Sequence, residues 1–185
     1  MEIGKKRALG LVLSGGSARG LAHLGFLEVL EENHIPIDAI VGTSMGAFVG
    51  GIYIAGNLKK FKEKLLNLSK NRFLALFLSH RIRRGNASTE SIEPFLRELI
   101  GNKKIEKLPI YYTAVATDLR TGKEVFIDKG DLTKAILASI SIPGIFNPVK
   151  IGRKLLVDGG VVDPLPQKYG QLIADKVITV NYTTS

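Results

Sequence analysis

Ser44 lies between two glycines in the stretch GTSMG, and its surroundings favour nucleophilic chemistry. It follows residues typical of a strand and precedes residues typical of a helix, the context in which a GxSxG turn becomes a nucleophile elbow. In such a turn Gly42 and Gly46 avoid steric collisions, and the hydroxyl stands at a helix start, where backbone N–H groups stabilise negative charge. Short matches of this kind also arise by chance, so an ordinary bend of small residues is the alternative.

A glycine-rich turn, SGGSARG, is the second feature that could carry chemistry. No lysine and hydroxyl residue follow Gly20, so the turn is not a P-loop, and its glycines lack the GxGxxG spacing of a dinucleotide site. The remaining anion is the oxyanion of a tetrahedral acyl intermediate, for which Gly15 and Gly16 would supply adjacent N–H donors. Arg19 could hold this loop or meet a phosphate, and a structural salt bridge is the alternative role.

A serine nucleophile needs a base, and histidine is the usual one. The three histidines of the chain are His23, His34 and His80. All precede the acidic candidates late in the chain, so the Ser–Asp–His order of α/β-hydrolases cannot be formed. We interpret His23 as a packed core residue on the apolar face of a helix. We interpret His34, at a helix end, and His80, in a basic segment, as solvated.

Asp158, in KLLVDGGVVDPLP, is the remaining candidate base, because it ends an apolar strand at the edge of a parallel sheet, where active sites collect. An exposed aspartate with a pKa near ~3.9 would be a poor base for a serine hydroxyl. A Ser–Asp dyad therefore implies a direct hydrogen bond and a partly desolvated carboxylate. A turn-forming role is the alternative for Asp158, and Asp163 and Asp118 are rival carboxylates, interpreted as turn and hairpin residues.

The elements that must position these residues alternate in the manner of βαβ units around a largely parallel sheet. Apolar runs and turn residues predict strands at 8–13, 37–41, 110–119, 154–160 and 176–182, and an antiparallel neighbour of the third of these at 124–128. Helical periodicity and cap residues predict helices at 21–33, 47–57, 88–101 and 133–142.

Length and composition fit this architecture. The 185 residues, 45% of them hydrophobic, predict a single domain over 1–185 with a continuous core. Because the chain has no cysteine, thiol catalysis, cysteine-ligated metal sites and disulfides are excluded, and a cytoplasmic location is expected. The apolar run 8–13 is too short for a signal core or a membrane span. We find no calcium-loop pattern and no clustered metal ligands, so no metal or other cofactor is expected.

The net charge of +9 is concentrated in one stretch, residues 58–84, which we term the basic segment. It holds nine basic residues and one acidic residue, a net charge of +8. Near-helical spacing of its apolar residues would let it lie on an anionic bilayer with its lysines at the headgroups. An amphipathic helix packed on the domain is the alternative. Nucleic-acid binding is not expected, because no stacking aromatic array accompanies the charge.

Five sequence blocks, taken in order, are more specific than any one of them: SGGSARG with its following helix, GTSMG, ATDLRTGKEVF, ASISIPGIFNPV and VDGGVVDPLP. In these blocks the chain resembles the patatin-like phospholipases over nearly its whole length. The resemblance implies a three-layer α/β/α fold with a central, mostly parallel sheet and the activity of a lipid acyl hydrolase. It further implies Ser44 as nucleophile, Asp158 as its catalytic partner, Gly15 and Gly16 as oxyanion donors, and no triad histidine.

The chain departs from the family pattern in three respects. Ser17 stands where the family often has a third glycine, and Asp163 stands where relatives frequently carry asparagine, which puts a second acid near the site. The chain is also short for the family, so a lid or docking module after the last strand is expected to be missing.

Two other functions stay open: a soluble esterase or thioesterase with the same dyad, and a membrane-binding regulatory module with weak catalysis. The expected partners are a lipid or acyl ester and an anionic membrane surface.

Overall fold

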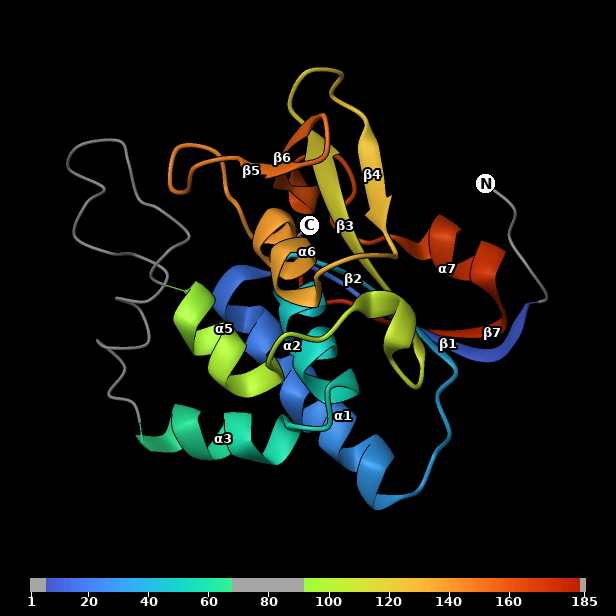
Figure 1. Ribbon diagram of the computed structural model, residues 1–185. Coiled ribbons are helices and arrows are strands. Elements are labelled where there is room, and N and C mark those ends of the chain that lie inside the picture. Colours follow the sequence, from blue (N-terminus) through green and yellow to red (C-terminus); the bar gives the residue numbers. More distant parts are fainter. Residues whose placement is uncertain (1–5, 68–91, 184–185) are drawn as a thin grey trace.

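A seven-stranded mixed sheet forms the centre of the molecule in a computed structural model that describes residues 6–67 and 92–183 (Figure 1). The strands are β1 (Arg7–Leu13), β2 (Ala39–Thr43), β3 (Tyr111–Asp118), β4 (Glu124–Ile127), β5 (Val149–Ile151), β6 (Lys154–Asp158) and β7 (Ala174–Val180). Their order across the sheet is β5-β6-β3-β2-β1-β7, and β4 pairs with β3 outside this path.

Parallel pairing joins the strands that lead into the glycine-rich turn and into Ser44. β1 lies between β2 and β7, and β2 lies beside β3, all parallel, which confirms the predicted parallel centre of the sheet. The predicted antiparallel pairing of β4 with β3 is also confirmed. These four parallel strands have their carboxyl ends on one side of the sheet, where Ser44 follows β2.

The strand that ends at Asp158 runs against this direction, contrary to expectation. β6 is antiparallel to β3 and to β5, with Asp158 opposite Ala116. The reason is the connection: β5 and β6 are joined by a two-residue turn at Gly152, which allows only a hairpin, whereas parallel strands need a long crossover. Asp158 therefore reaches the carboxyl ends of the parallel strands from the opposite direction.

Helices cover both faces of the sheet. They are α1 (His23–Glu32), α2 (Met45–Ile54), α3 (Leu58–Asn67), α5 (Glu93–Ile100), α6 (Leu132–Ser139) and α7 (Gln167–Ile173), with 3-10 turns η1 (Ser17–Ala22), η4 (Ile105–Lys107) and η5 (Gly159–Val161). Alternate residues of the buried strands contribute to two clusters, a large one beneath α1, α2, α3, α5 and α6 and a small one beneath α7. Figure 1 shows α7 on the opposite side of the sheet from α1 and α2, which confirms the three-layer α/β/α architecture.

Helix ends differ from the predictions by a few residues. α1 begins at His23 because the chain first makes the 3-10 turn η1. α6 ends at Ser139, three residues before the position predicted from Pro143, since the residue before a proline avoids the helical conformation. Of the helix predicted at 88–101, the structure describes α5, which has Pro94 in its first turn; the serine and threonine cap candidates lie outside the described residues.

The described part of the basic segment is helix α3. Its buried residues Leu58 and Phe61 pack on the core, and the Phe61 ring lies edge-on to Phe48 at a centroid distance of 5.6 Å. Lys62 pairs with Glu28 at 2.9 Å, and Lys60 and Lys64 pair with Glu98 at 3.9 Å and 2.6 Å. Residues 58–67 thus match the alternative of a helix packed on the domain, while the rest of the segment lies outside the described residues. No helix within 6–67 or 92–183 is long and apolar enough to cross a membrane.

Candidate active site

Ser44 occupies a strained turn between β2 and α2. Its backbone has φ 52° and ψ −118°, a positive φ that residues with side chains rarely adopt and that costs about 1–3 kcal/mol. A Cβ at Gly42 would lie 2.6 Å from the Ala47 nitrogen, and a Cβ at Gly46 would lie 2.5 Å from the Ser14 carbonyl oxygen. Neither position has room for a side chain, so the steric reason expected for both glycines is present in the turn.

The Ser44 hydroxyl contacts a buried carboxylate. Its Oγ donates to Asp158 Oδ2 at 2.7 Å, and the other carboxylate oxygen accepts the Gly160 N–H at 2.7 Å. Asp158 is only 5% exposed. This burial raises the pKa of its carboxyl from 3.8 to about 6, against the opposing effect of the two hydrogen bonds. The direct hydrogen bond and the desolvated carboxylate that a Ser–Asp dyad requires are therefore both present.

The rival carboxylates have other contacts. Asp118 accepts the Arg120 N–H on its side chain at 3.0 Å and closes the β3–β4 hairpin through its backbone. Asp163 is partly buried after η5, its carbonyl accepts the Thr43 hydroxyl at 2.9 Å, and desolvation raises the pKa of its carboxyl. Within the described residues, neither carboxylate contacts Ser44, which leaves Asp158 as the carboxylate in contact with the nucleophile candidate.

The glycine-rich turn lies against Ser44, and one of its two predicted oxyanion donors, the Gly15 N–H, already has an acceptor. A Cβ at Gly15 would lie 3.6 Å from the Ser44 Cβ, so the two residues are neighbours. The Gly15 N–H donates to the Pro164 carbonyl at 2.9 Å and is therefore not free to bind an oxyanion. Among the described residues, the N–H groups of Gly16 and Ser17 donate to no acceptor. Of the predicted donor pair, Gly16 therefore has a free N–H in this structure and Gly15 does not, while the Ser17 N–H is also free among the described residues.

Arg19 is exposed on η1, close to this turn. Its backbone N–H donates to the Gly16 carbonyl at 3.0 Å, and its side chain forms no ion pair with any residue that the structure describes. The structural salt bridge considered for Arg19 is thus absent from the described part of the chain. Together with Tyr182 and Thr183, the residues of this turn line a surface hollow of about 440 Å³.

The two histidines that the structure describes, His23 and His34, form no hydrogen bond with Ser44. His23 is fully buried, its Nε2 lies 2.9 Å from the Ser14 carbonyl oxygen, and its ring meets the Tyr182 ring edge-on at 4.8 Å. His23 is thus a packed core residue, as predicted, and burial lowers the pKa of its ring, partly offset by the hydrogen bond to Ser14. His34 is exposed just after α1, with φ 52°. His80 lies outside the described residues.

Sequence reasoning missed the residues that hold the backbone of the two site residues. The Ser44 N–H donates to Ser139 Oγ at 2.9 Å, and the Asp158 N–H donates to the Ser141 carbonyl at 2.8 Å. The Thr117 hydroxyl donates to the Asp158 carbonyl at 3.0 Å. The available signal was the run ASISIPG, in which serines alternate with apolar residues at the end of a helix and are therefore buried polar groups that need partners.

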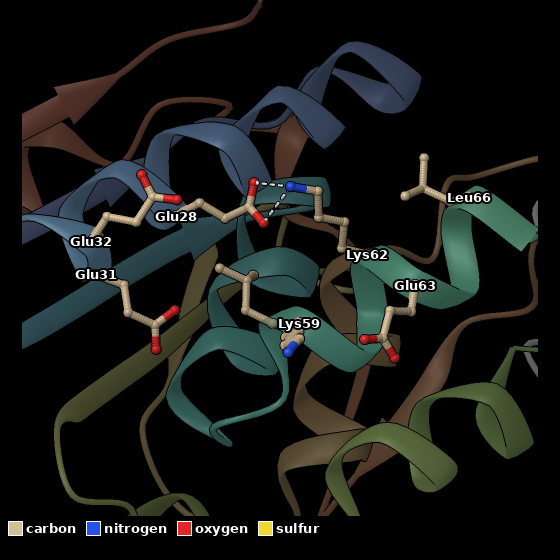
Figure 2. Close-up of a pocket in the computed structure, with 8 residues that line it drawn as sticks. Glu28, Glu31, Glu32, Lys59, Lys62, Glu63 and Leu66 are labelled. Carbon is tan, nitrogen blue, oxygen red and sulfur yellow. Dashed lines mark hydrogen bonds and ion pairs between the residues drawn. The ribbon is translucent and has the colours of Figure 1, made fainter.

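A second surface hollow, of about 420 Å³, lies between α1 and α3. Figure 2 shows acidic side chains of α1 on one side and mixed charges of α3 on the other, joined by the Lys62–Glu28 ion pair. Its lining residues are Glu28, Glu31, Glu32, Leu58, Lys59, Lys62, Glu63 and Leu66. None of these is a predicted site residue, and within 6–67 and 92–183 no group of three or more acidic or histidine side chains is arranged to hold a metal ion.

Comparison of the sequence with known proteins identifies a family. A model of the patatin-like phospholipase family matches residues 11–169. The chain is 44% identical over 156 residues to an uncharacterized NTE family protein of Mycobacterium tuberculosis, covering 84% of this chain and 43% of the relative. It is 33% identical over 174 residues to lysophospholipase NTE1 of Saccharomyces cerevisiae, covering 86% of this chain and 10% of the relative. It thus spans less than half the length of either relative.

The fold also matches a solved structure. The crystal structure of VipD from Legionella pneumophila superposes with a TM-score of 0.59 at 15% identity, over 94% of this chain and 49% of that one. At this identity the likeness concerns the α/β fold alone.

Proposed function

The chain belongs to the patatin-like phospholipase family, and from this premise we propose that it is a lipid acyl hydrolase that cleaves carboxylic esters through a Ser44–Asp158 dyad. The observation that carries the proposal is the 2.7 Å hydrogen bond from Ser44 Oγ to the buried Asp158 carboxylate, made at a strained turn after a parallel strand. The lysophospholipase name of the yeast relative supports a phospholipid or lysophospholipid as the substrate class.

The first half of the reaction acylates Ser44. The Asp158 carboxylate accepts the hydroxyl proton as Ser44 Oγ attacks the ester carbonyl carbon, and the carbonyl electrons move to the oxygen. The free N–H groups of Gly16 and Ser17 donate to this oxyanion. When the tetrahedral intermediate collapses, the C–O bond to the alcohol breaks, and the leaving alcohol takes the proton from Asp158.

The second half releases the acyl group. A water molecule attacks the acyl-serine while Asp158 again accepts a proton, and the second collapse yields a carboxylic acid and restores the Ser44 hydroxyl. A carboxyl with a pKa of about 6 suits this alternation, because it is ionised at neutral pH and yet more basic than an exposed aspartate.

A membrane surface is the proposed partner, reached through the basic segment of a cytoplasmic protein. Three lysines of α3 are already paired with Glu28 and Glu98, so the charge left for anionic headgroups resides mainly in residues 68–84. This stretch contains five basic residues and no acidic residue. One apolar side chain of α3, Leu66, is 77% exposed and available for contact with acyl chains.

A fluorophosphonate probe tests the proposed dyad, since it reacts with an activated serine. We expect covalent labelling of the wild-type chain at Ser44, none in Ser44→Ala, and strongly reduced labelling in Asp158→Asn. Asp163→Asn is the matched control, because it removes the rival carboxylate that follows the same strand. If Ser44→Ala is labelled like the wild type, or Asp163→Asn is the variant that loses labelling, the assignment is wrong.

A panel of acyl substrates tests the substrate class. Phospholipids, lysophospholipids, acylglycerols and thioesters are compared, with Ser44→Ala as the blank. Turnover of lipid esters that increases in anionic vesicles supports the proposal. Turnover confined to short-chain esters or thioesters and indifferent to vesicles would instead favour a soluble esterase or thioesterase, and vesicle binding without any hydrolysis would favour a regulatory module.

A further inference from the structure

The turn at the end of α6, residues 139–141, is bonded to both members of the dyad. Ser139 accepts the Ser44 N–H on its side chain, and Ser141 accepts the Asp158 N–H on its carbonyl. We propose that Ser139 is a positioning residue for the nucleophile and that this turn, termed the α6 turn, sets the relative placement of Ser44 and Asp158. The inference rests on the proposed function of the dyad.

The Ser139 side chain connects the nucleophile turn to the strand beneath it. Its hydroxyl accepts from the Ser44 N–H at 2.9 Å and donates to the Val115 carbonyl of β3 at 2.6 Å. Ser139 is fully buried, and its bond to the Val115 carbonyl lies in the protein interior. A hydroxyl can accept and donate at once, whereas alanine does neither, which makes the residue type specific for this bridge.

The other side of the α6 turn holds the base. The Asp158 N–H donates to the Ser141 carbonyl at 2.8 Å, and this bond uses only the main chain of Ser141. The Ser141 hydroxyl is directed elsewhere, since it donates to the Leu137 carbonyl one helical turn back at 2.6 Å. The α6 turn therefore contacts both members of the dyad through residues two positions apart: Ser44 through the Ser139 side chain and Asp158 through the Ser141 carbonyl.

Sheet geometry explains why such a bridge is needed. β3 lies between β2, which leads to Ser44, and β6, which ends at Asp158. At about 4.8 Å per strand, the two backbones are separated by roughly 10 Å, and only their side chains meet. The α6 helix packs on both β3 and β6, so its last residues cross this gap above β3. Without the bond to Ser139, the Ser44 N–H would lose its acceptor in a turn that is already strained.

Ser139→Ala tests the inference, with Thr133→Val as the matched control. Thr133 lies on the same helix, is fully buried, and has a hydroxyl with no partner among the described residues, so its loss removes no bond. We expect Ser139→Ala to lower the rate of fluorophosphonate labelling and kcat for a soluble ester by about tenfold to a hundredfold, with KM nearly unchanged. Thr133→Val should keep both rates.

A spectroscopic readout separates positioning from general stability and does not depend on turnover. In an amide ¹H–¹⁵N spectrum, Ser139→Ala should shift the Ser44 amide proton upfield and speed its exchange with solvent, while Thr133→Val leaves both unchanged. If Ser139→Ala does not fold, Ser139→Cys replaces it, because a thiol of similar size is only a weak donor and acceptor and should give the same changes to a smaller degree.

The outcomes distinguish the two proposals. Wild-type labelling and an unshifted Ser44 amide in the Ser139 variants would overturn the positioning role while the dyad stands. A wild-type chain that the probe does not label at Ser44 would overturn the dyad, and with it the catalytic meaning of the bridge, even if the amide shift is found.

Discussion

Replacing Asp158 with asparagine should make the protein more stable at neutral pH while abolishing its activity. Burial raises the pKa of this carboxyl from 3.8 to about 6, so the folded chain holds its proton more tightly than the unfolded chain does. Ionising Asp158 therefore costs the folded protein free energy. The stability that the protonated form contributes is fully present below pH ~4 and is lost as the pH rises through about 6.

The size of the effect follows from the same pKa. At 1.36 kcal/mol for each tenfold change in proton affinity, the difference between 3.8 and about 6 corresponds to about 3 kcal/mol. Asparagine has no charge to lose, and its amide can still accept from Gly160 and face the Ser44 hydroxyl. The free energy of unfolding of Asp158→Asn, relative to that of the wild type, should therefore increase by about 3 kcal/mol from pH 4 to pH 8. This corresponds to roughly 6–12 °C in Tm for a chain of this size.

Thermal unfolding of both proteins, followed by circular dichroism at several pH values from 4 to 8, measures this gain. The quantity to compare is the Tm of the variant minus the Tm of the wild type, followed as a function of pH. An effect of the substitution that does not depend on pH shifts this Tm difference equally at every pH and therefore cancels. Glu106→Gln is a control of opposite sign, because the Gly130 N–H bond to Glu106, 2.8 Å long, lowers the pKa of that carboxyl. Its removal should cost stability at pH 8 relative to pH 4.

A constant difference between Asp158→Asn and the wild type from pH 4 to 8 would refute the reasoning. Asp158 would then have an ordinary pKa, and the desolvation on which its proposed role as base depends would be absent. A variant that is more stable but still hydrolyses esters would contradict the other half of the prediction, the role of Asp158 as base.

Four further outcomes are expected. For the wild type, kcat/KM for a soluble ester should rise with pH and reach half its maximum near the Asp158 pKa of about 6, as measured by a pH–rate profile. Gly46→Ala should destabilise the fold by more than about 3 kcal/mol, or prevent folding, in a denaturant titration, because its Cβ meets backbone. Gly16→Ala, at φ 130°, should lower kcat more than Gly15→Ala, whose Cβ makes only ordinary contacts. Asp131→Ala should cost about 1 kcal/mol in Tm-derived stability, because its side chain caps α6.

The buried strands were the part of the fold most open to prediction. β1 and β3 were located to within a residue at either end, because apolar and β-branched residues dominate both strands and turn residues follow them. β5, with three residues, and α7, whose sequence QKYGQLI contains a glycine, were not predicted. α7 exists through its packing: a Cβ at Gly170 would collide with Val12, so the helix lies directly on the sheet, an arrangement that no local pattern reports.

For the candidate site, the sequence pointed to two residues that the structure brings into contact, but not to the geometry around them. Ser44 and Asp158 followed from a motif and from the elimination of histidine, although their hydrogen bond joins residues 114 positions apart. The direction of β6 depends on the hairpin that precedes it, and the engagement of the Gly15 N–H depends on Pro164, which is distant in sequence. Residue spacing in the sequence does not reveal which hydrogen-bond partners the sheet brings together. For this reason the free N–H of Ser17 and the bond from Ser44 to Ser139 were not predicted.

The pairing of β1 with β7 affects the order in which the protein can fold during its synthesis on the ribosome. Arg7 to Leu13 are made before Ala174 to Val180, so one edge of β1 stays unpaired until β7 has been synthesised. The glycine-rich turn is completed later still, when the Ser14 hydroxyl accepts the Tyr182 N–H at 2.8 Å. A nascent chain can therefore bury most of its core before the turn that would bind the oxyanion is held in place. Synthesis order delays the assembly of the site, and an unfinished chain beside a membrane is expected to be inert toward its lipids.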